Sequence, residues 1–226
     1  MAVAGAAGPA GRAALLRLAE AGATVVAADA DAARLAEAVD AARYAHGGAT
    51  VTGDTVDLLD LDATRAWADR TEKEFGRIDG LVHLVGGWRG SATFAETDLA
   101  DWELLEKLLI RTVQHTSLAF EAPLCRSGNG RYLLVSAAGA SKPTAGNAAY
   151  SASKAAAEAW TLRSATPSAR RGAMRPRPPR PPSWWSRRWC TTPCAPSGPM
   201  RNSRVSPTSR TWRRPSSTSG RSPPRM

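Results

Sequence analysis

The chain has 226 residues, 43% of them hydrophobic, and carries 30 Lys and Arg against 20 Asp and Glu, a net charge of +10. The charge is uneven, because residues 163–226 hold 15 Arg and no Lys, Asp or Glu, which leaves residues 1–162 with a net charge of −5. A basic average that belongs to one segment does not define a nucleic-acid-binding protein.

Other classes of protein are excluded by what the sequence lacks. No apolar run approaches the roughly 20 residues of a membrane span, so we expect no membrane partner. The N-terminus shows no basic segment followed by a long apolar one, as a secretory signal would. The three cysteines are too few for a disulfide framework and lack the spacing of a zinc site. We therefore expect a cytoplasmic protein without a metal.

Short apolar runs alternate with helical patterns through residues 1–162. Helical spacing of apolar residues predicts helices, the first closed by Gly22, the second capped by Asp31 and the third closed by Gly76. In chain order, the predicted elements are a strand at 2–4, a helix at 12–21, a strand at 23–28, a helix at 31–46, a strand at 50–56, a helix at 62–75, a strand at 78–85, one long helix at 99–122, a strand at 131–136 and a helix at 148–162.

This alternation is typical of a parallel sheet covered by helices on both faces. We therefore predict an α/β fold with a doubly wound, Rossmann-like parallel sheet, in which ligands bind at the carboxyl ends of the strands. The first strand has three residues before Gly5, where about 5–6 are usual, so we expect the true start to lie upstream of Met1.

Residues 163–226 have a different composition from the rest of the chain. They contain 13 of the 16 Pro and one Val, with no Ile, Leu, Phe or Tyr. The apolar area that this segment could bury is too small to offset the conformational entropy lost on ordering it. We therefore expect a disordered tail, with the C-terminal strands missing or disordered. The change falls inside a helix without a linker, and we hypothesise a shift of reading frame near 161–164.

A glycine-rich turn, Gly5 to Gly11 with Gly8 between, follows the first strand and opens a helix. Glycines let the backbone turn tightly and approach a pyrophosphate at the helix N-terminus. The alternative is a turn with no ligand. Asp29 ends the second strand and can accept bonds from a ribose, or can act as a helix cap. No Arg or Lys adjoins it, which favours NAD over NADP.

Three further strand ends carry candidate residues. Asp57 follows the third strand and Gly86 the fourth, where a bare backbone can pass close to a ligand. Ser136 ends the fifth strand, and its hydroxyl could hydrogen-bond a substrate oxygen. For Asp57 and Ser136 the alternative is an ordinary turn residue.

Tyr150 and Lys154 stand four residues apart on a predicted helix and so share one face. A cation beside a phenol favours the phenolate, so we expect Lys154 to lower the pKa of Tyr150. Such a phenol can exchange a proton with a carbonyl or alcohol oxygen. The alternative is an incidental pair on a surface helix.

Taken together, these motifs resemble the short-chain dehydrogenase/reductase family over residues 2–162. The resemblance implies a cofactor turn at Gly5, Gly8 and Gly11, an NAD-selecting acid at Asp29 and an adenine contact at Asp57. It also implies a catalytic Tyr150 and Lys154, of which Lys154 also holds the ribose, and a substrate-orienting Ser136, serving hydride transfer between a nicotinamide and a carbonyl or alcohol carbon.

The chain departs from the family pattern at four places. Pro9 replaces the middle glycine of the turn, and His83 to Gly86 reads His-Leu-Val-Gly where Asn-Asn-Ala-Gly is usual. Leu109 aligns with the helix Asn of the proton relay, and Ser136 needs a one-residue slip from the usual serine position.

The sequence thus predicts an NAD-dependent oxidoreductase of small carbonyl or alcohol substrates in residues 1–162 and a separate tail in 163–226. The resemblance implies a homo-oligomer. Because the family's last strand and substrate loop are replaced by the tail, we expect the chain as written to fold poorly and to turn over little substrate. The alternatives are a non-catalytic cofactor-binding protein, or nucleic-acid binding through the basic tail, for which we expect no sequence specificity.

Overall fold

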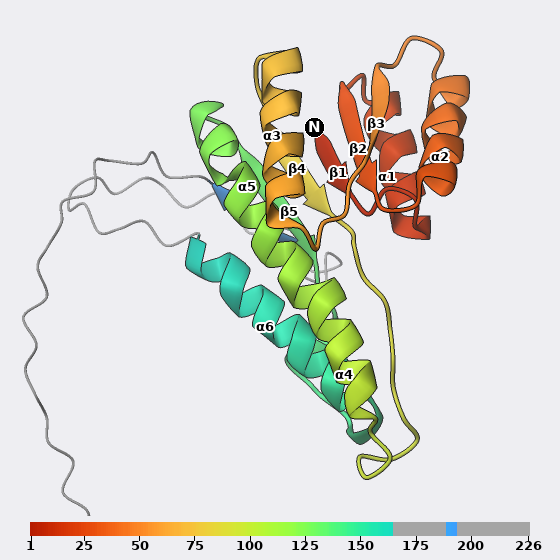
Figure 1. The fold of residues 1–226 in the computed structure, drawn as a ribbon, viewed down its shortest axis with the longest axis vertical. Coiled ribbons are helices and arrows are strands. Elements are labelled where there is room, and N and C mark those ends of the chain that lie inside the picture. The colour runs from red at the N-terminus through yellow and green to blue at the C-terminus, as the bar shows by residue number, and fades with distance from the viewer. Residues whose placement is uncertain (165–188, 194–226) are drawn as a thin grey trace, which may run out of the picture.

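A sheet with five parallel strands forms the centre of the protein (Figure 1). The computed structural model describes residues 1–164 and 189–193. The strand order is β3-β2-β1-β4-β5-β6, in which β6 alone runs antiparallel to its neighbour. The strands are β1 (Ala2–Ala4), β2 (Val25–Asp29), β3 (Val51–Thr55), β4 (Gly80–His83), β5 (Arg131–Val135) and β6 (Trp189–Pro193). This order confirms the predicted doubly wound α/β fold.

Helices cover both faces of the sheet (Figure 1). On one face lie α1 (Pro9–Glu20) and α2 (Ala32–Ala45), and on the other lie α3 (Leu61–Phe75), α5 (Thr112–Arg126) and α6 (Ala148–Ser164). Alternate residues of each strand point to opposite faces, so the described residues form one hydrophobic core on each face. Ala2 and Ala4 of β1 join the core that holds Trp67 and Phe120, whereas Val3 joins the core of α1 and α2.

Capping residues stand at the starts and ends of the helices where the sequence predicts them. The Asp31 carboxylate accepts a hydrogen bond from Arg34 N at 3.0 Å, which satisfies a free amide at the start of α2. Gly76 closes α3 in the left-handed conformation, at φ 75°. Gly22, at φ 73°, follows α1 in the same way.

The predicted helix at 99–122 is wrong in one respect, because it is not one regular α-helix. It begins as α4 (Leu99–Leu105), widens into a π-helical segment, η1 (Glu106–Arg111), and continues as α5 to Arg126. A π turn inserts an extra residue without ending the helix, so apolar periodicity does not reveal it.

The tail lies mostly outside the described residues, and so does the predicted disorder of residues 165–188 and 194–226. Within the tail, Trp189–Pro193 is strand β6, paired with β5 from Arg131 to Val135, where the composition predicted no strand. Helix α6 continues two residues past the predicted boundary at 162.

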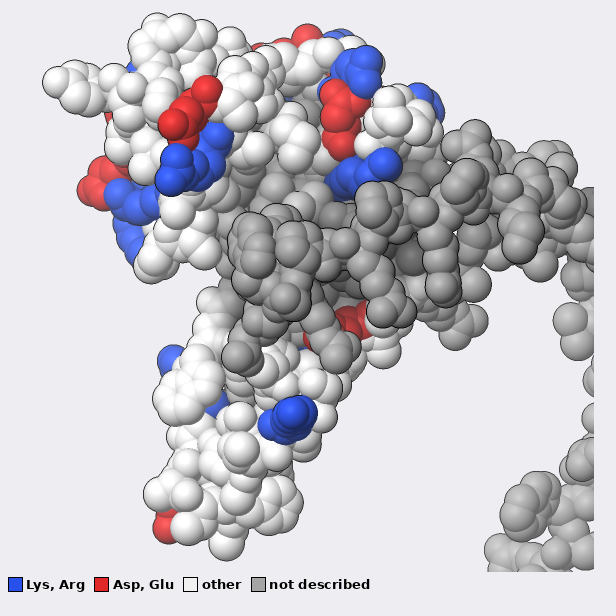
Figure 2. Space-filling view, turned by 180° about the vertical axis from the view of Figure 1, so that it is seen from behind, with Lys and Arg blue, Asp and Glu red and all other residues white. Residues whose placement is uncertain are grey.

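The described surface carries mixed charge. Figure 2 shows basic and acidic side chains lying beside one another on one face. Surface ion pairs such as Arg12–Glu37, at 2.9 Å, account for part of this mixing. A field of one sign, which would steer nucleic acid, does not stand out among the described residues on that face. None of the helices in the described part is long and apolar enough to cross a membrane.

Candidate functional site

The candidate residues follow strands that end at the same edge of the sheet. Ala4 of β1 lies beside Ala28 of β2 and His83 of β4, and His83 lies beside Leu134 of β5. Asp29, the last residue of β2, lies beside Thr55 at the end of β3. The residues at or just beyond these strand ends therefore gather at one edge, as a doubly wound sheet requires. They include Gly5, Asp29, Asp57, Gly86 and Ser136.

The three glycines of the turn differ in what surrounds them. Gly5 has a φ of 79°, and a Cβ there would lie 2.6 Å from Val85 N. A Cβ on Gly11 would lie 2.6 Å from the Cα of Ala6, so this glycine lets α1 pack against the turn. A Cβ on Gly8 would meet only Gly5 O, at 3.7 Å. Gly5 and Gly11 close the turn, and Gly8 leaves room for a ligand to approach the backbone.

Gly8 is also the N-cap of α1, and no side chain caps this helix. Uncapped amides at a helix N-terminus favour a phosphate. Pro9 occupies the first helical position, which suits its fixed φ but removes one amide donor. The cradle therefore fits a pyrophosphate with one N–H fewer than the usual glycine provides.

Asp29 bonds to the same turn. Its carboxylate accepts from Ala7 N at 2.9 Å and from Asp31 N at 3.2 Å, and each oxygen keeps a lone pair for a ribose hydroxyl. Two arginines that do not adjoin Asp29 in the sequence bond the residue that Asp29 holds. Arg12 Nε and Arg34 Nη2 both donate to Ala7 O, at 3.1 and 3.4 Å. They come from two helices, so neighbours in sequence did not reveal them.

Asp57 and Gly86 have local structural tasks as well. The Asp57 carboxylate accepts from Leu59 N at 2.9 Å, as a turn aspartate does, and remains exposed. The adjacent Val56 N donates to Asp29 O at 3.0 Å, which brings this loop to the end of β2. A Cβ on Gly86 would lie 3.2 Å from Leu109 Cδ2, so its absence lets η1 approach the end of β4.

Lys154 joins α6 to the end of β5. Its side chain is buried, and Nζ donates to Val135 O at 2.9 Å and lies 5.9 Å from the centroid of the Tyr150 ring. Burial lowers the pKa of Lys154, while Glu158 acts in the opposite direction. Tyr150 is half-buried, and burial raises its pKa. The predicted lowering of the Tyr150 pKa is therefore wrong here, because the ammonium bonds a carbonyl and the phenol is desolvated.

Ser136 directly follows β5, next to the carbonyl that holds Lys154. Its hydroxyl oxygen is buried and has no hydrogen-bond partner among the described residues. A buried hydroxyl without a partner costs free energy, and a substrate oxygen would supply the missing bond. Ala137, at the family's usual position, has no hydroxyl to offer.

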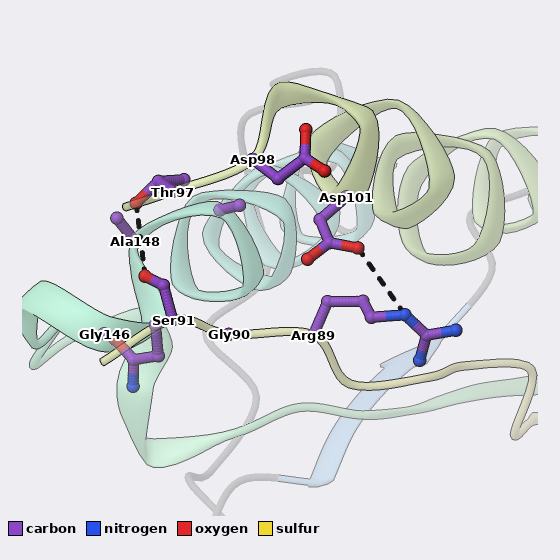
Figure 3. Close-up of a pocket in the computed structure, with 10 residues that line it drawn as sticks. Arg89, Gly90, Ser91, Thr97, Asp98, Asp101, Gly146 and Ala148 are labelled. Atoms are coloured by element: carbon purple, nitrogen blue, oxygen red, sulfur yellow. Dashed lines mark hydrogen bonds and ion pairs between the residues drawn. The ribbon is translucent and has the colours of Figure 1, made fainter. Parts of the chain in front are cut away.

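Two contacts hold the loop after β4, one to the segment just before α6 and one to α4. Ser91 N donates to Gly146 O at 2.9 Å, and Arg89 pairs with Asp101 at 3.5 Å (Figure 3). The cavity between them measures about 10 Å³, room for about one water and not for a substrate. These contacts hold the loop after β4 in place, and Trp88 at its start is 62% exposed.

Asn147, which was not among the predicted site residues, holds the turn that contains Tyr150. The Asn147 side-chain oxygen accepts from Thr144 N at 2.7 Å and from Ser151 Oγ at 2.8 Å, which anchors the first turn of α6. The spacing Thr-x-x-Asn before a helix is a capping signal that could have identified it.

This fold and this arrangement of strand ends define a Rossmann-like α/β protein. The chain matches the short chain dehydrogenase family over residues 1–174 and belongs to the short-chain dehydrogenase/reductase family. It is 30% identical, over 146 residues, to a short-chain type dehydrogenase/reductase of Mycolicibacterium smegmatis, covering 59% of this chain and 52% of that relative. The chain thus spans about half the length of the curated relative it matches.

Solved structures of relatives agree with the fold. A short chain oxidoreductase of Pseudomonas aeruginosa, solved with NADPH and described as having an atypical catalytic center, is 32% identical with a TM-score of 0.68, over 73% of this chain and 63% of its own. NAD⁺-bound xylitol dehydrogenase is 26% identical with the same TM-score, over 73% and 62%. Relatives of both cofactor types therefore share this architecture.

Proposed function

We propose that the chain carries the cofactor-binding and catalytic part of an oxidoreductase that transfers a hydride between NAD(H) and a small carbonyl or alcohol. Tyr150 is the general acid/base, Lys154 holds the ribose, and Ser136 orients the substrate oxygen. The observation that carries the proposal is the 2.9 Å bond from Lys154 Nζ to Val135 O, since it holds the Tyr150 helix to the strand end that bears Ser136.

The proton chemistry follows from the environment of the phenol. Because burial raises its pKa, Tyr150 is protonated at neutral pH and can donate a proton to a carbonyl oxygen, the direction of reduction. The Ser136 hydroxyl supplies a second bond to that oxygen and keeps it near the phenol. When bound, the nicotinamide supplies the hydride.

NAD is the cofactor that the turn favours. The Asp29 carboxylate can accept from a ribose hydroxyl and repels a 2′-phosphate. Of the two guanidinium groups that bond Ala7 O, that of Arg12 already pairs with Glu37 at 2.9 Å. Glu37 offsets part of the attraction that a phosphate would feel there, so we expect NADH to bind more tightly than NADPH.

Replacing Tyr150 by Phe tests the catalytic role. We expect Tyr150→Phe in the full chain to keep its NADH affinity, measured by fluorescence, and to lose reduction of a panel of small ketones by about 100-fold or more. Tyr44→Phe is the matched control, because Tyr44 is 94% exposed on α2. A Tyr150→Phe chain that reduces ketones as fast as the wild type would refute the role. NADH binding without reduction of any ketone would favour a non-catalytic cofactor-binding protein.

A further inference from the structure

His83 is a fully buried histidine that the proposed chemistry does not use. It is the last residue of β4 and is 1% exposed. Its Nε2 lies 3.2 Å from Thr112 Oγ1 and its Nδ1 lies 3.1 Å from Thr116 Oγ1, both on α5. The imidazole thus joins the central strand to the helix that follows the π-helical segment.

The network continues into β5 on one side and into η1 on the other. Thr116 Oγ1 lies 2.8 Å from the hydroxyl of Tyr132, a buried residue of β5. Thr112 Oγ1 donates to Leu108 O at 2.7 Å, within η1. Four side chains and one backbone carbonyl therefore form a continuous chain of polar contacts through the interior.

A neutral imidazole has one N–H and one lone pair, so one threonine hydroxyl accepts from the ring and the other donates to it. Each hydroxyl also lies near a backbone carbonyl one turn earlier, at 2.7 Å for Thr112 Oγ1 and Leu108 O and at 2.8 Å for Thr116 Oγ1 and Thr112 O. With the ring proton on Nε2, Thr112 keeps its bond to Leu108 O and Thr116 donates to Nδ1. With the ring proton on Nδ1, Thr116 keeps its bond to Thr112 O and Thr112 donates to Nε2, so only the first tautomer lets Thr112 hold η1. Burial and the charge of Lys154 keep the ring neutral by lowering its pKa to about 3.

Contacts of η1 connect this network to the candidate site. A Cβ on Gly86 would lie 3.2 Å from Leu109 Cδ2, and one on Gly87 would lie 3.3 Å from Leu108 Cδ1. The Gly86–Gly87 turn and η1 therefore rest directly on each other. Because Thr112 holds the Leu108 carbonyl, the position of that contact depends on His83.

We propose that His83 is a positioning residue whose neutral, Nε2-protonated ring, acting through Thr112, fixes η1 against the Gly86–Gly87 turn of the cofactor site. This inference rests on the proposed function, in which that turn lies along the bound dinucleotide. The contacts of Thr116 join the ring to Tyr132 of β5, and their role is to stabilise the fold and not the cofactor site. The two threonines therefore have different tasks although each contacts the same ring.

Four variants of the full chain separate these tasks. His83→Leu removes the ring contacts, Thr112→Val breaks the arm to η1, and Thr116→Val breaks the arm to Tyr132. Thr71→Val is the matched control, because Thr71 is a buried threonine whose hydroxyl bonds its own helix, at Trp67 O. We expect His83→Leu and Thr112→Val to weaken NADH binding by about 10-fold, and Thr116→Val and Thr71→Val to leave it within about twofold.

Two readouts do not need the cofactor. Hydrogen exchange of amides 106–113, followed by mass spectrometry, should speed up in His83→Leu and Thr112→Val and stay unchanged in the other two variants. The chain has three histidines, so ¹⁵N spectra can identify the His83 ring, which should carry its proton on Nε2 at pH 7. His83→Gln, which keeps a donor and an acceptor, should restore part of the protection.

The outcomes are distinguishable. A wild-type chain that does not bind NADH refutes the proposed function, while exchange and the ring tautomer still judge the role of His83. Equal NADH affinity in His83→Leu and the wild type, or equal effects of the two threonine variants, overturns the positioning role. A proton on Nδ1, or a charged ring at pH 7, overturns the assignment of the network.

Discussion

Pro9 changes the proposed cofactor site without changing the fold. It fits the first position of α1, where a missing N–H costs the helix nothing. In the proposed site the same N–H would donate to a bound phosphate, so the proline removes one hydrogen bond to the ligand. Gly5 and Gly11 act differently, because a side chain at either would collide with backbone and distort the turn itself.

Restoring the amide should therefore strengthen cofactor binding. We expect Pro9→Gly to raise NADH affinity by about fivefold, which corresponds to ~1 kcal/mol for one hydrogen bond. Isothermal titration calorimetry measures the change. Pro9→Ala is the control, since it restores the N–H without the freedom of glycine, and a gain from Gly but not from Ala would count against the explanation.

At the scale of elements, β4, α5 and β5 depend on one uncharged ring. The folded pKa of His83 is about 3, against an ordinary value of 6.5, so the unfolded chain binds a proton more readily. The stabilisation by the neutral ring is complete above about pH 6.5 and is lost as the pH falls toward 3. Lys154 adds to the effect, because its charge opposes a second positive charge nearby.

Urea unfolding at pH 7 and pH 5 tests this dependence. Between these values the wild-type chain should lose about 2 kcal/mol of stability through His83, in addition to what other groups contribute. His83→Gln cannot titrate, so its loss over the same interval should be smaller by that amount. Identical losses in the two proteins would mean that the ring is not buried in a neutral form.

Elements with a regular period were predictable, and contacts between distant residues were not. Leu35, Ala38, Val39 and Ala42 line the buried face of α2 as the spacing predicts. The widened turn at η1 has no signal of this kind. His83 and Thr116 are 33 residues apart and meet only once the sheet has formed. The sequence therefore predicted which motifs follow the strands at one edge of the sheet, but not which side chains hold those segments in place, and the site itself stays a prediction.

The pair of arginines at the glycine turn illustrates the same limit. Arg12 and Arg34 belong to different helices and converge on Ala7 O through the packing of α1 against α2. Cofactor preference depends on charges gathered in space, and a search along the sequence beside Asp29 could not detect them.

For the whole molecule, the main question is the origin of residues 163–226. Their composition has no counterpart in the α/β part, and the hypothesis of a shifted reading frame near 161–164 makes a direct prediction. Sequencing the gene there should reveal a one-base displacement that restores an acidic, amphipathic continuation. If no displaced frame yields such a continuation, the tail is the true product and the hypothesis fails.

Strand β6 gives the tail a consequence for self-association. It pairs with β5 along Arg131 to Val135 and so caps the outermost parallel strand. A shortened version ending at residue 164 would leave the amides and carbonyls of that strand open, the kind of edge on which other molecules assemble into aggregates. Removing the arginine-rich segment to improve solubility would therefore leave β5 as an unpaired edge strand that favours aggregation.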